Sequence, residues 1–160
     1  MQHSITLRNA MQVATMLLLA ATVFTACSKS KDDNPGPGPS GHQLKVTITT
    51  TDLKPQEGDA LSFLFVGSNL DGSTIDWKVD GQLKSNQTGI TLEADVLSSG
   101  KQITVESAKS FAKAGIIING GNRGTPYKFS YKVELDGKEV NNEQNITVST
   151  NIFSRPHDYP

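Results

Sequence analysis

Cysteine is the most informative absence in this sequence. The 160 residues contain a single cysteine, Cys27. No disulfide can form within the chain, so its fold has to rest on a packed core. Histidine is almost as scarce, because His3, His42 and His157 all lie outside the segment 44–154 that carries the strand pattern. We therefore expect no Ser–His, Cys–His or histidine-rich metal site in that segment, and no enzyme activity.

An excess of charge of one sign is also missing. The chain has 15 basic and 16 acidic side chains, which gives a formal net charge of −1. A protein that binds nucleic acid normally carries a basic field that attracts phosphate groups. Nucleic acid is therefore not an expected partner.

A long apolar run is missing too, but a short one lies near the N-terminus. Val13 to Phe24 (VATMLLLAATVF) follows Arg8 and precedes Thr25-Ala26-Cys27. A membrane-spanning helix needs about 20 apolar residues, whereas a signal peptide needs fewer. An ordinary secretory signal and a buried apolar helix are the alternatives that the run alone leaves open.

The order of charge, apolar run, small residues and cysteine resembles the lipobox of bacterial lipoproteins. The resemblance implies a signal peptide over residues 1–26 and a lipid, with palmitate among its acyl chains, on Cys27. The small residues suit the extended chain in the peptidase cleft, and the thiol accepts the lipid. Apart from this covalent lipid, which makes the membrane a partner, we expect no cofactor.

Residues 27–43 indicate a tether. Lys31-Asp32-Asp33 resembles the short acidic export signals of Bacteroidota-type surface lipoproteins, which implies an outer-membrane protein that faces the cell exterior. A merely solvated leader, with the domain on the periplasmic face, is the alternative. Pro35 to Gly41 (PGPGPSG) cannot form a helix or a sheet ladder, because Pro lacks an N–H and Gly is flexible. It is therefore a spacer.

From Leu44 onward, apolar and polar residues alternate with the period of a β-strand. The alternating or continuous apolar positions are Val46 and Ile48; Leu61, Phe63 and Phe65; Ile75, Trp77 and Val79; Ile90, Leu92 and Ala94; Ile103 and Val105; Ile116–Ile118; Phe129, Tyr131, Val133 and Leu135; Ile146 and Val148. Asp-Gly pairs at 71–72, 80–81 and 136–137 are hairpin signals. Segment 106–114 is left open as a short helix or a crossover, and residues 155–160 are expected to be a tail.

This pattern predicts an all-β fold, a single antiparallel β-sandwich of about seven to eight strands. The segment Ile75 to Gly81 (IDWKVDG) resembles the third strand of immunoglobulin-like and PKD-like domains, in which a Trp faces the core and a turn follows. The resemblance implies an immunoglobulin-like sandwich without the usual disulfide. The phase of the alternation places Trp77 in the core rather than on a sugar-binding surface.

Two groups of acidic side chains are candidates for chemistry. Asn69, Asp71 and Asp76 have oxygen ligands at the spacing of a calcium loop, but lack the bidentate Glu of an EF-hand. A hydrogen-bonded turn explains them equally well, so no metal is expected. The pairs Asp76 with Asp80 and Glu93 with Asp95 are each expected on one face of a strand. Such neighbours keep a sheet soluble more often than they form the two-sided cleft of a glycosidase.

Gly120 to Gly124 (GGNRG) does not match a phosphate-binding glycine motif, because a strand follows it and not a helix. We expect it to be a loop that exposes Asn122 and Arg123 to a binding partner. We then expect the chain to be a non-catalytic surface lipoprotein that binds a glycan or a protein. A structural subunit of an envelope complex, which assembles by strand-edge pairing, is the alternative function.

The lipid assignment can be tested by metabolic labelling. Radiolabelled palmitate should enter the wild-type protein and be absent from Cys27→Ala, because the thiol is the atom that accepts the lipid. Label that persists in the variant would contradict the lipoprotein assignment and the expected localisation together.

Overall fold

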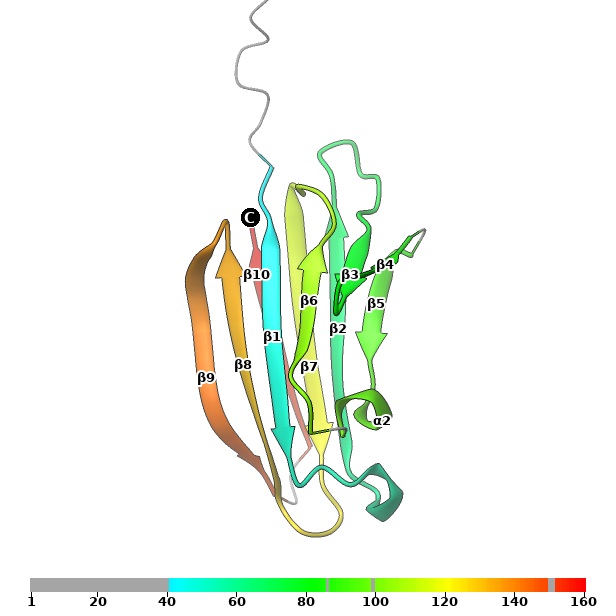
Figure 1. Cartoon of the computed structure of the whole chain (residues 1–160), viewed down its shortest axis with the longest axis vertical. Coiled ribbons are helices and arrows are strands. Elements are labelled where there is room, and N and C mark those ends of the chain that lie inside the picture. Colours follow the sequence, from blue (N-terminus) through cyan, green and yellow to red (C-terminus); the bar gives the residue numbers. More distant parts are fainter. Residues whose placement is uncertain (1–40, 86, 99, 150–151) are drawn as a thin grey trace, which may run out of the picture. The chain divides into compact units, whose positions relative to one another are not determined.

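Two antiparallel β-sheets pack face to face (Figure 1). The computed structural model describes residues 41–85, 87–98, 100–149 and 152–160, so the predicted signal peptide, Cys27 and linker residues up to 40 lie outside the described residues. The larger sheet has the order β4 (Gln82–Lys84), β3 (Trp77–Val79), β6 (Ile103–Ser107), β1 (Leu44–Thr51), β8 (Tyr127–Leu135), β9 (Lys138–Val148). The smaller has the order β10 (Phe153–Tyr159), β7 (Lys113–Gly121), β2 (Ala60–Ser68), β5 (Gly89–Leu92). The predicted all-β sandwich is confirmed.

The last strand corrects the expected C-terminal tail. Residues Phe153–Tyr159 form β10, which pairs with β7 from Gly120 to Ala114. The prediction was wrong because polar Arg155 and His157 stand between the aromatic residues Phe153 and Tyr159 at the half-buried positions, so the apolar alternation is weak in the sequence. Together with the three-residue strand β4, β10 raises the number of strands in the described residues to ten. It also brings His157 into the sandwich, which contradicts the expectation of a histidine-free fold.

Two other segments depart from the expected strands. The strand predicted to continue through Asp95 ends at Leu92, and a helical turn, α2 (Ala94–Leu97), buries Ala94 and Leu97 instead. The segment left open at 106–114 is a crossover: β6 ends at Ser107, Phe111 is buried, and β7 begins at Lys113. α2 and the 3-10 turn η1 (Pro55–Glu57) are short, and no helix in the described ranges is long and apolar enough to cross a membrane.

The Asp-Gly turns agree with the sequence at two of three positions. Asp80 and Asp136 both have positive φ, 49° and 53°, as the tight hairpin turns β3–β4 and β8–β9 require. Asp71-Gly72 forms a turn that closes only the isolated antiparallel bridge between Ser68 and Thr74, because β2 and β3 on either side of it belong to different sheets. The turn there redirects the chain from one layer to the other.

The strands at the sheet edges are poor templates for adding another strand. β4 has three residues and β5 has four. β9 has two register irregularities and a positive φ at Asn145, and β10 contains Pro156, which has no N–H to donate. Short strands, bulges and prolines are the features that prevent edge-to-edge pairing in natural sheets.

Trp77 is a core residue, as its alternation with charged neighbours predicts. Its exposed fraction is 0%, and its ring lies 5.8 Å from that of Phe65 in the opposite sheet. Ile75, on the same side of the chain, is also buried. The register fixes this choice, because a slip by one residue would bury Asp76 and Lys78 instead.

Replacing Trp77 by Ala should destabilise the sandwich by about 3–5 kcal/mol, through lost burial and the cavity that remains. That loss is a large part of the roughly 5–15 kcal/mol by which a domain is usually stable. Chemical denaturation measures it, and Leu83→Ala on neighbouring β4 is the control, because Leu83 is 55% exposed. Solvent-like emission from the tryptophan, together with normal stability of Trp77→Ala, would contradict the core position.

Candidate functional site

The loops fall into two groups at opposite ends of the sandwich (Figure 1). We call the end where the described chain begins, at residue 41, the proximal end; connections 69–76, 108–112 and 136–137 lie there. The distal end is formed by connections 52–59, 93–98 and 122–126. β1 runs from the proximal to the distal end, so the two groups are separated by the length of the strands.

A buried polar brace organises the distal end. The Asn122 side-chain amide donates to Asp59 Oδ1 at 2.7 Å and to the Thr125 carbonyl at 2.8 Å, and its Oδ1 accepts from Gly124 N at 3.1 Å. Asp59 Oδ2 accepts from Lys54 N at 2.9 Å. Asn122 is only 7% exposed. It was predicted to face a partner, but it instead holds the β7–β8 loop against the β1–β2 loop.

Arg123 is the exposed neighbour of this brace. Gly58, with φ of 92°, leaves room for it: a Cβ at Gly58 would lie 3.3 Å from Arg123 Cδ. The glycines before the loop have another role than the one predicted, because Gly120 and Gly121 belong to β7. A Cβ at Gly120 would lie 2.4 Å from the ring of Phe153, so the absence of a side chain lets β10 dock.

A pocket of about 440 Å³ opens beside the brace. It is lined by Asp59, Ala60, Leu61, Ser62, Glu93, Ala94, Asp95, Asn119, Gly120, Gly121 and Ile152. The charged residues in this lining are all carboxylates, and Ile152 is 91% exposed. The predicted pair Glu93 and Asp95 thus lies at the start of α2, on the rim of a pocket rather than on a flat strand face.

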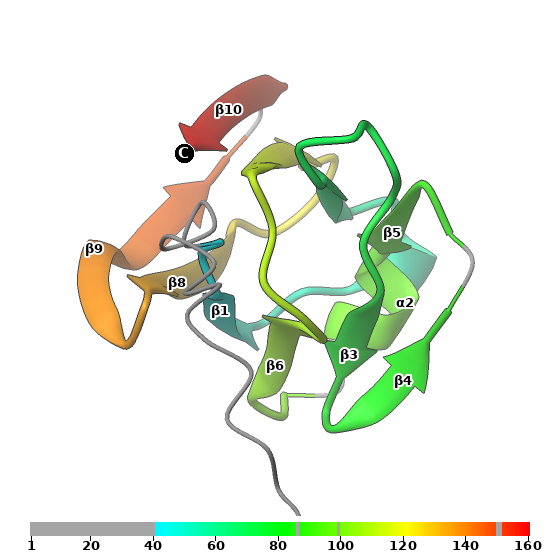
Figure 2. The same ribbon diagram turned by 90° about the horizontal axis from the view of Figure 1, so that it is seen from above.

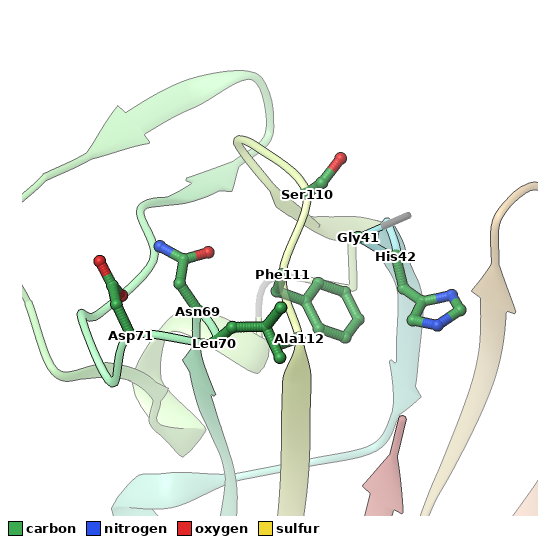
Figure 3. Close-up of a pocket in the computed structure, with 8 residues that line it drawn as sticks. All are labelled: Gly41, His42, Asn69, Leu70, Asp71, Ser110, Phe111 and Ala112. Carbon is green, nitrogen blue, oxygen red and sulfur yellow. The ribbon is translucent and has the colours of Figure 1, made fainter. Parts of the chain in front are cut away.

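A second pocket, of about 520 Å³, lies at the proximal end (Figure 3). Asn69, Leu70 and Asp71 approach it from the β2–β3 connection, while the ring of Phe111 and the His42 side chain lie on the other side. His42 Nδ1 is 2.7 Å from Asp136 Oδ2, and this contact lowers the pKa of the Asp136 carboxyl. Leu70 is 72% exposed beside these polar groups.

The predicted oxygen-ligand loop lies at this proximal end and is closed by internal hydrogen bonds. Asn69 Nδ2 donates to Ser73 Oγ at 2.9 Å, and Ser73 N donates to Asp71 Oδ1 at 2.9 Å. The hydrogen bonds from Ser73 lower the pKa of Asp71.

The other predicted acidic residues, Asp76 and Asp80, flank β3. The Asp76 carbonyl accepts a hydrogen bond from Ala108 N, and Asp80 Oδ1 accepts one from Thr104 N. In the described ranges, no three His, Cys, Asp or Glu side chains are grouped so that they could hold a metal ion.

Sequence reasoning missed a third polar cluster, which closes the side of the sandwich where β9 and β10 lie (Figure 2). We call it the seam: Tyr131, Glu143, Arg155 and His157. Tyr131 Oη donates to Glu143 Oε1 at 2.6 Å and lies 2.9 Å from His157 Nε2, and Arg155 Nη1 donates to Glu143 Oε2 at 2.6 Å. The only signal for it in the sequence is the alternation of Phe153, Arg155, His157 and Tyr159.

The seam shifts the acidity of its members. Burial, followed by the hydrogen bond to Glu143, raises the pKa of the Tyr131 hydroxyl. The bond from Tyr131, followed by the charge of Arg155, holds the pKa of Glu143 below its ordinary 4.5 despite partial burial. Because the Tyr131 proton points to Glu143, His157 has to present an Nε2–H to the Tyr131 oxygen. The arrangement bonds β10 to both β8 and β9 across the two layers.

Three solved structures resemble the sandwich. A domain of unknown function, DUF4425, from Bacteroides vulgatus ATCC 8482 has a TM-score of 0.52 at 12% identity and covers 75% of this chain and 94% of its own. A DUF4425 family protein from Bacteroides ovatus ATCC 8483 has a TM-score of 0.50 at 14% identity, with the same coverage. A protein from Parabacteroides distasonis, solved by NMR in its calcium-bound form, has a TM-score of 0.50 at 16% identity and covers 78% and 99%.

At these identities the likeness concerns the fold alone. No protein family profile matches the chain, and no curated protein sequence matches it. The sources of the three neighbours, Bacteroides and Parabacteroides species, are consistent with a Bacteroidota-type protein.

The seam generates a pH prediction. A carboxyl whose pKa is lower in the folded than in the unfolded chain stabilises the fold above its unfolded pKa, and this contribution is lost as pH falls through the folded pKa. Glu143→Gln should therefore be less stable than the wild type at pH 7, and the difference should shrink below the ordinary Glu pKa of 4.5. Denaturation at pH 7 and at about pH 3 measures it.

The matched control is Glu139→Gln, on the same strand, whose carboxylate accepts from the exposed Asn142 amide at 3.1 Å. It should change stability little at either pH. A constant difference between wild type and Glu143→Gln across this range would show that the seam does not act through the Glu143 charge.

Proposed function

We propose that this chain is a non-catalytic lipoprotein of the cell envelope, which is held by a lipid on Cys27 and binds a glycan or a protein through the distal end of its sandwich. The observation that carries the proposal is the position of residue 41, at which the described part of the chain begins. Residue 41 lies at one end, and the braced loops 52–59 and 122–126 lie at the other. A chain tethered from its N-terminal side therefore leaves the distal loops free to meet a partner.

The distal end also has the composition of a binding surface. Ile152 is exposed in the lining of a pocket with polar and apolar walls, and Arg123 is exposed in the β7–β8 loop. The Asp59–Asn122 brace holds the loops in place before any partner arrives, which lowers the entropy cost of binding. Display on the outer surface of the outer membrane fits the Lys31-Asp32-Asp33 sequence, as the resemblance to surface lipoproteins implies.

The absence of catalysis is part of the proposal, and the environment of the carboxylates supports it. Asp59, Asp71 and Asp80 each accept a hydrogen bond from a backbone N–H of a neighbouring turn or strand. These hydrogen bonds indicate that the three carboxylates stabilise the conformation of turns and loops. A hydrolase instead needs two carboxylates that face each other across a substrate cleft with separated pKa values.

Assembly by strand-edge pairing was the alternative function, and the edges give it little support. Pro156 removes a donor from β10, and β9 is bulged. Such edges offer an incomplete row of hydrogen-bonding groups to an added strand. Binding through loops is therefore the function that the geometry supports best.

Calcium binding is the second candidate function, favoured by the calcium-bound form of the Parabacteroides distasonis neighbour. The donor set does not fit as it stands, because the described residues contain no group of three suitable side chains. Calcium titration of the melting temperature decides the question. A rise that Asp71→Asn removes would place the ion at the proximal loop, and one that Asp95→Asn removes would place it at the distal pocket. An unchanged melting temperature would contradict this second candidate.

Site-specific photocrosslinking on intact cells tests the orientation. A crosslinking residue at position 123 should capture the partner, whether glycan or protein, because this position lies at the exposed distal tip. The same residue at position 70, which is also exposed but lies at the proximal end, is the matched control and should capture none. Capture from position 70 alone would overturn the proposed binding end.

A further inference from the structure

We infer that β1 transmits force, so that the sandwich links a membrane anchor to a distal partner in the direction in which it best resists unfolding. The inference rests on the proposed function, because a chain that is anchored at Cys27 and bound at its distal end is pulled along its strands. β1 begins at Leu44, three residues after the start of the described chain, and runs to Thr51 at the distal end. Tension from the N-terminal side therefore enters the sandwich through β1.

The neighbours of β1 share this tension. β1 lies inside the six-stranded sheet, with four antiparallel residue pairs to β6 and eight to β8. Ladder hydrogen bonds lie perpendicular to the strands. A pull along β1, opposed by a pull on the distal loops, loads all of these bonds in shear, and they have to break together.

The proximal end reinforces the start of β1. His42 N donates to the Phe111 carbonyl at 2.8 Å, and Phe111 N donates to the His42 carbonyl at 2.9 Å. Asp136 adds two contacts, from Gln43 N at 2.8 Å and to His42 Nδ1 at 2.7 Å. These bonds attach the start of β1 to the β6–β7 and β8–β9 connections, which lie outside its own ladder.

The C-terminus shows the opposite geometry. β10 ends at Tyr159 beside the proximal end, and within its sheet it pairs with β7 alone. A pull between the N-terminal side and the C-terminus would peel β10 from Tyr159 inward, one residue pair after another. We therefore expect the sandwich to resist a pull between its N-terminal side and the distal loops more strongly than a pull between its N-terminal side and the C-terminus.

Single-molecule force spectroscopy compares the two axes without any ligand. The chain from Cys27 to Pro160 has one natural thiol, which serves as the first handle. The second handle is Arg123→Cys in the distal loop or Pro160→Cys at the C-terminus. Because the rate of unfolding governs forced unfolding, we expect a mean force at least about twofold higher for the distal handle. Equal forces, or a higher force for the C-terminal handle, would overturn the inference.

Two half-buried histidines provide reciprocal variants. His42→Ala removes the side-chain contact to Asp136 and should lower the force for the distal handle alone, whereas His157→Ala loosens the seam and should lower it for the C-terminal handle alone. The reverse pattern would overturn the inference. If Cys27 took up no palmitate label, the proposed function and the tension that follows from a lipid anchor would be overturned. The unfolding forces would stay the same, so the failure of the proposed function and the failure of the inference are distinguishable.

Discussion

The packing of aromatic rings between the two sheets is the interaction on which the rest of the structure depends. Phe63 on β2 meets the rings of Phe129 and Tyr131 on β8 edge-on, at 5.9 and 6.0 Å, while Phe65 meets Trp77 at 5.8 Å. Aromatic pairs bury large areas and prefer tilted or edge-to-face geometries. Because the chain has a single cysteine, no internal disulfide can link the two sheets. The aromatic contacts hold the sheets together instead, as a disulfide does in many exported β-sandwich domains.

The position of the aromatic core also determines which polar groups are buried. Tyr131 belongs to the core through its ring and to the seam through its hydroxyl. Burying that hydroxyl requires partners, and Glu143 and His157 supply them. Arg155 then balances the charge of Glu143. The side of the sandwich next to β9 and β10 is thus closed by a hydrogen-bonded cluster, in which each polar group satisfies another.

The two ends of the sandwich are stabilised by the same chemistry and serve different purposes. At the proximal end, Asp136 bonds to Gln43 and His42 and fixes how β1 begins. At the distal end, Asp59 bonds to Lys54 and Asn122 and fixes how two loops meet. A carboxylate that accepts a backbone N–H replaces the water lost when a loop packs against a sheet. These bonds hold the loops at each end of the sandwich in a defined geometry.

The sequence by itself determined the all-β class, the core position of Trp77 and two tight hairpins, because period-two alternation and Asp-Gly turns depend on neighbours in the chain. The tertiary structure alone decided that Phe153–Tyr159 is a strand, since its register partner, β7, makes Arg155 and His157 face inward. It alone also decided that Asn122 is a brace. Asn122 and Asp59 are 63 residues apart, and no local pattern records a contact that forms when two loops reach the same end of the sandwich.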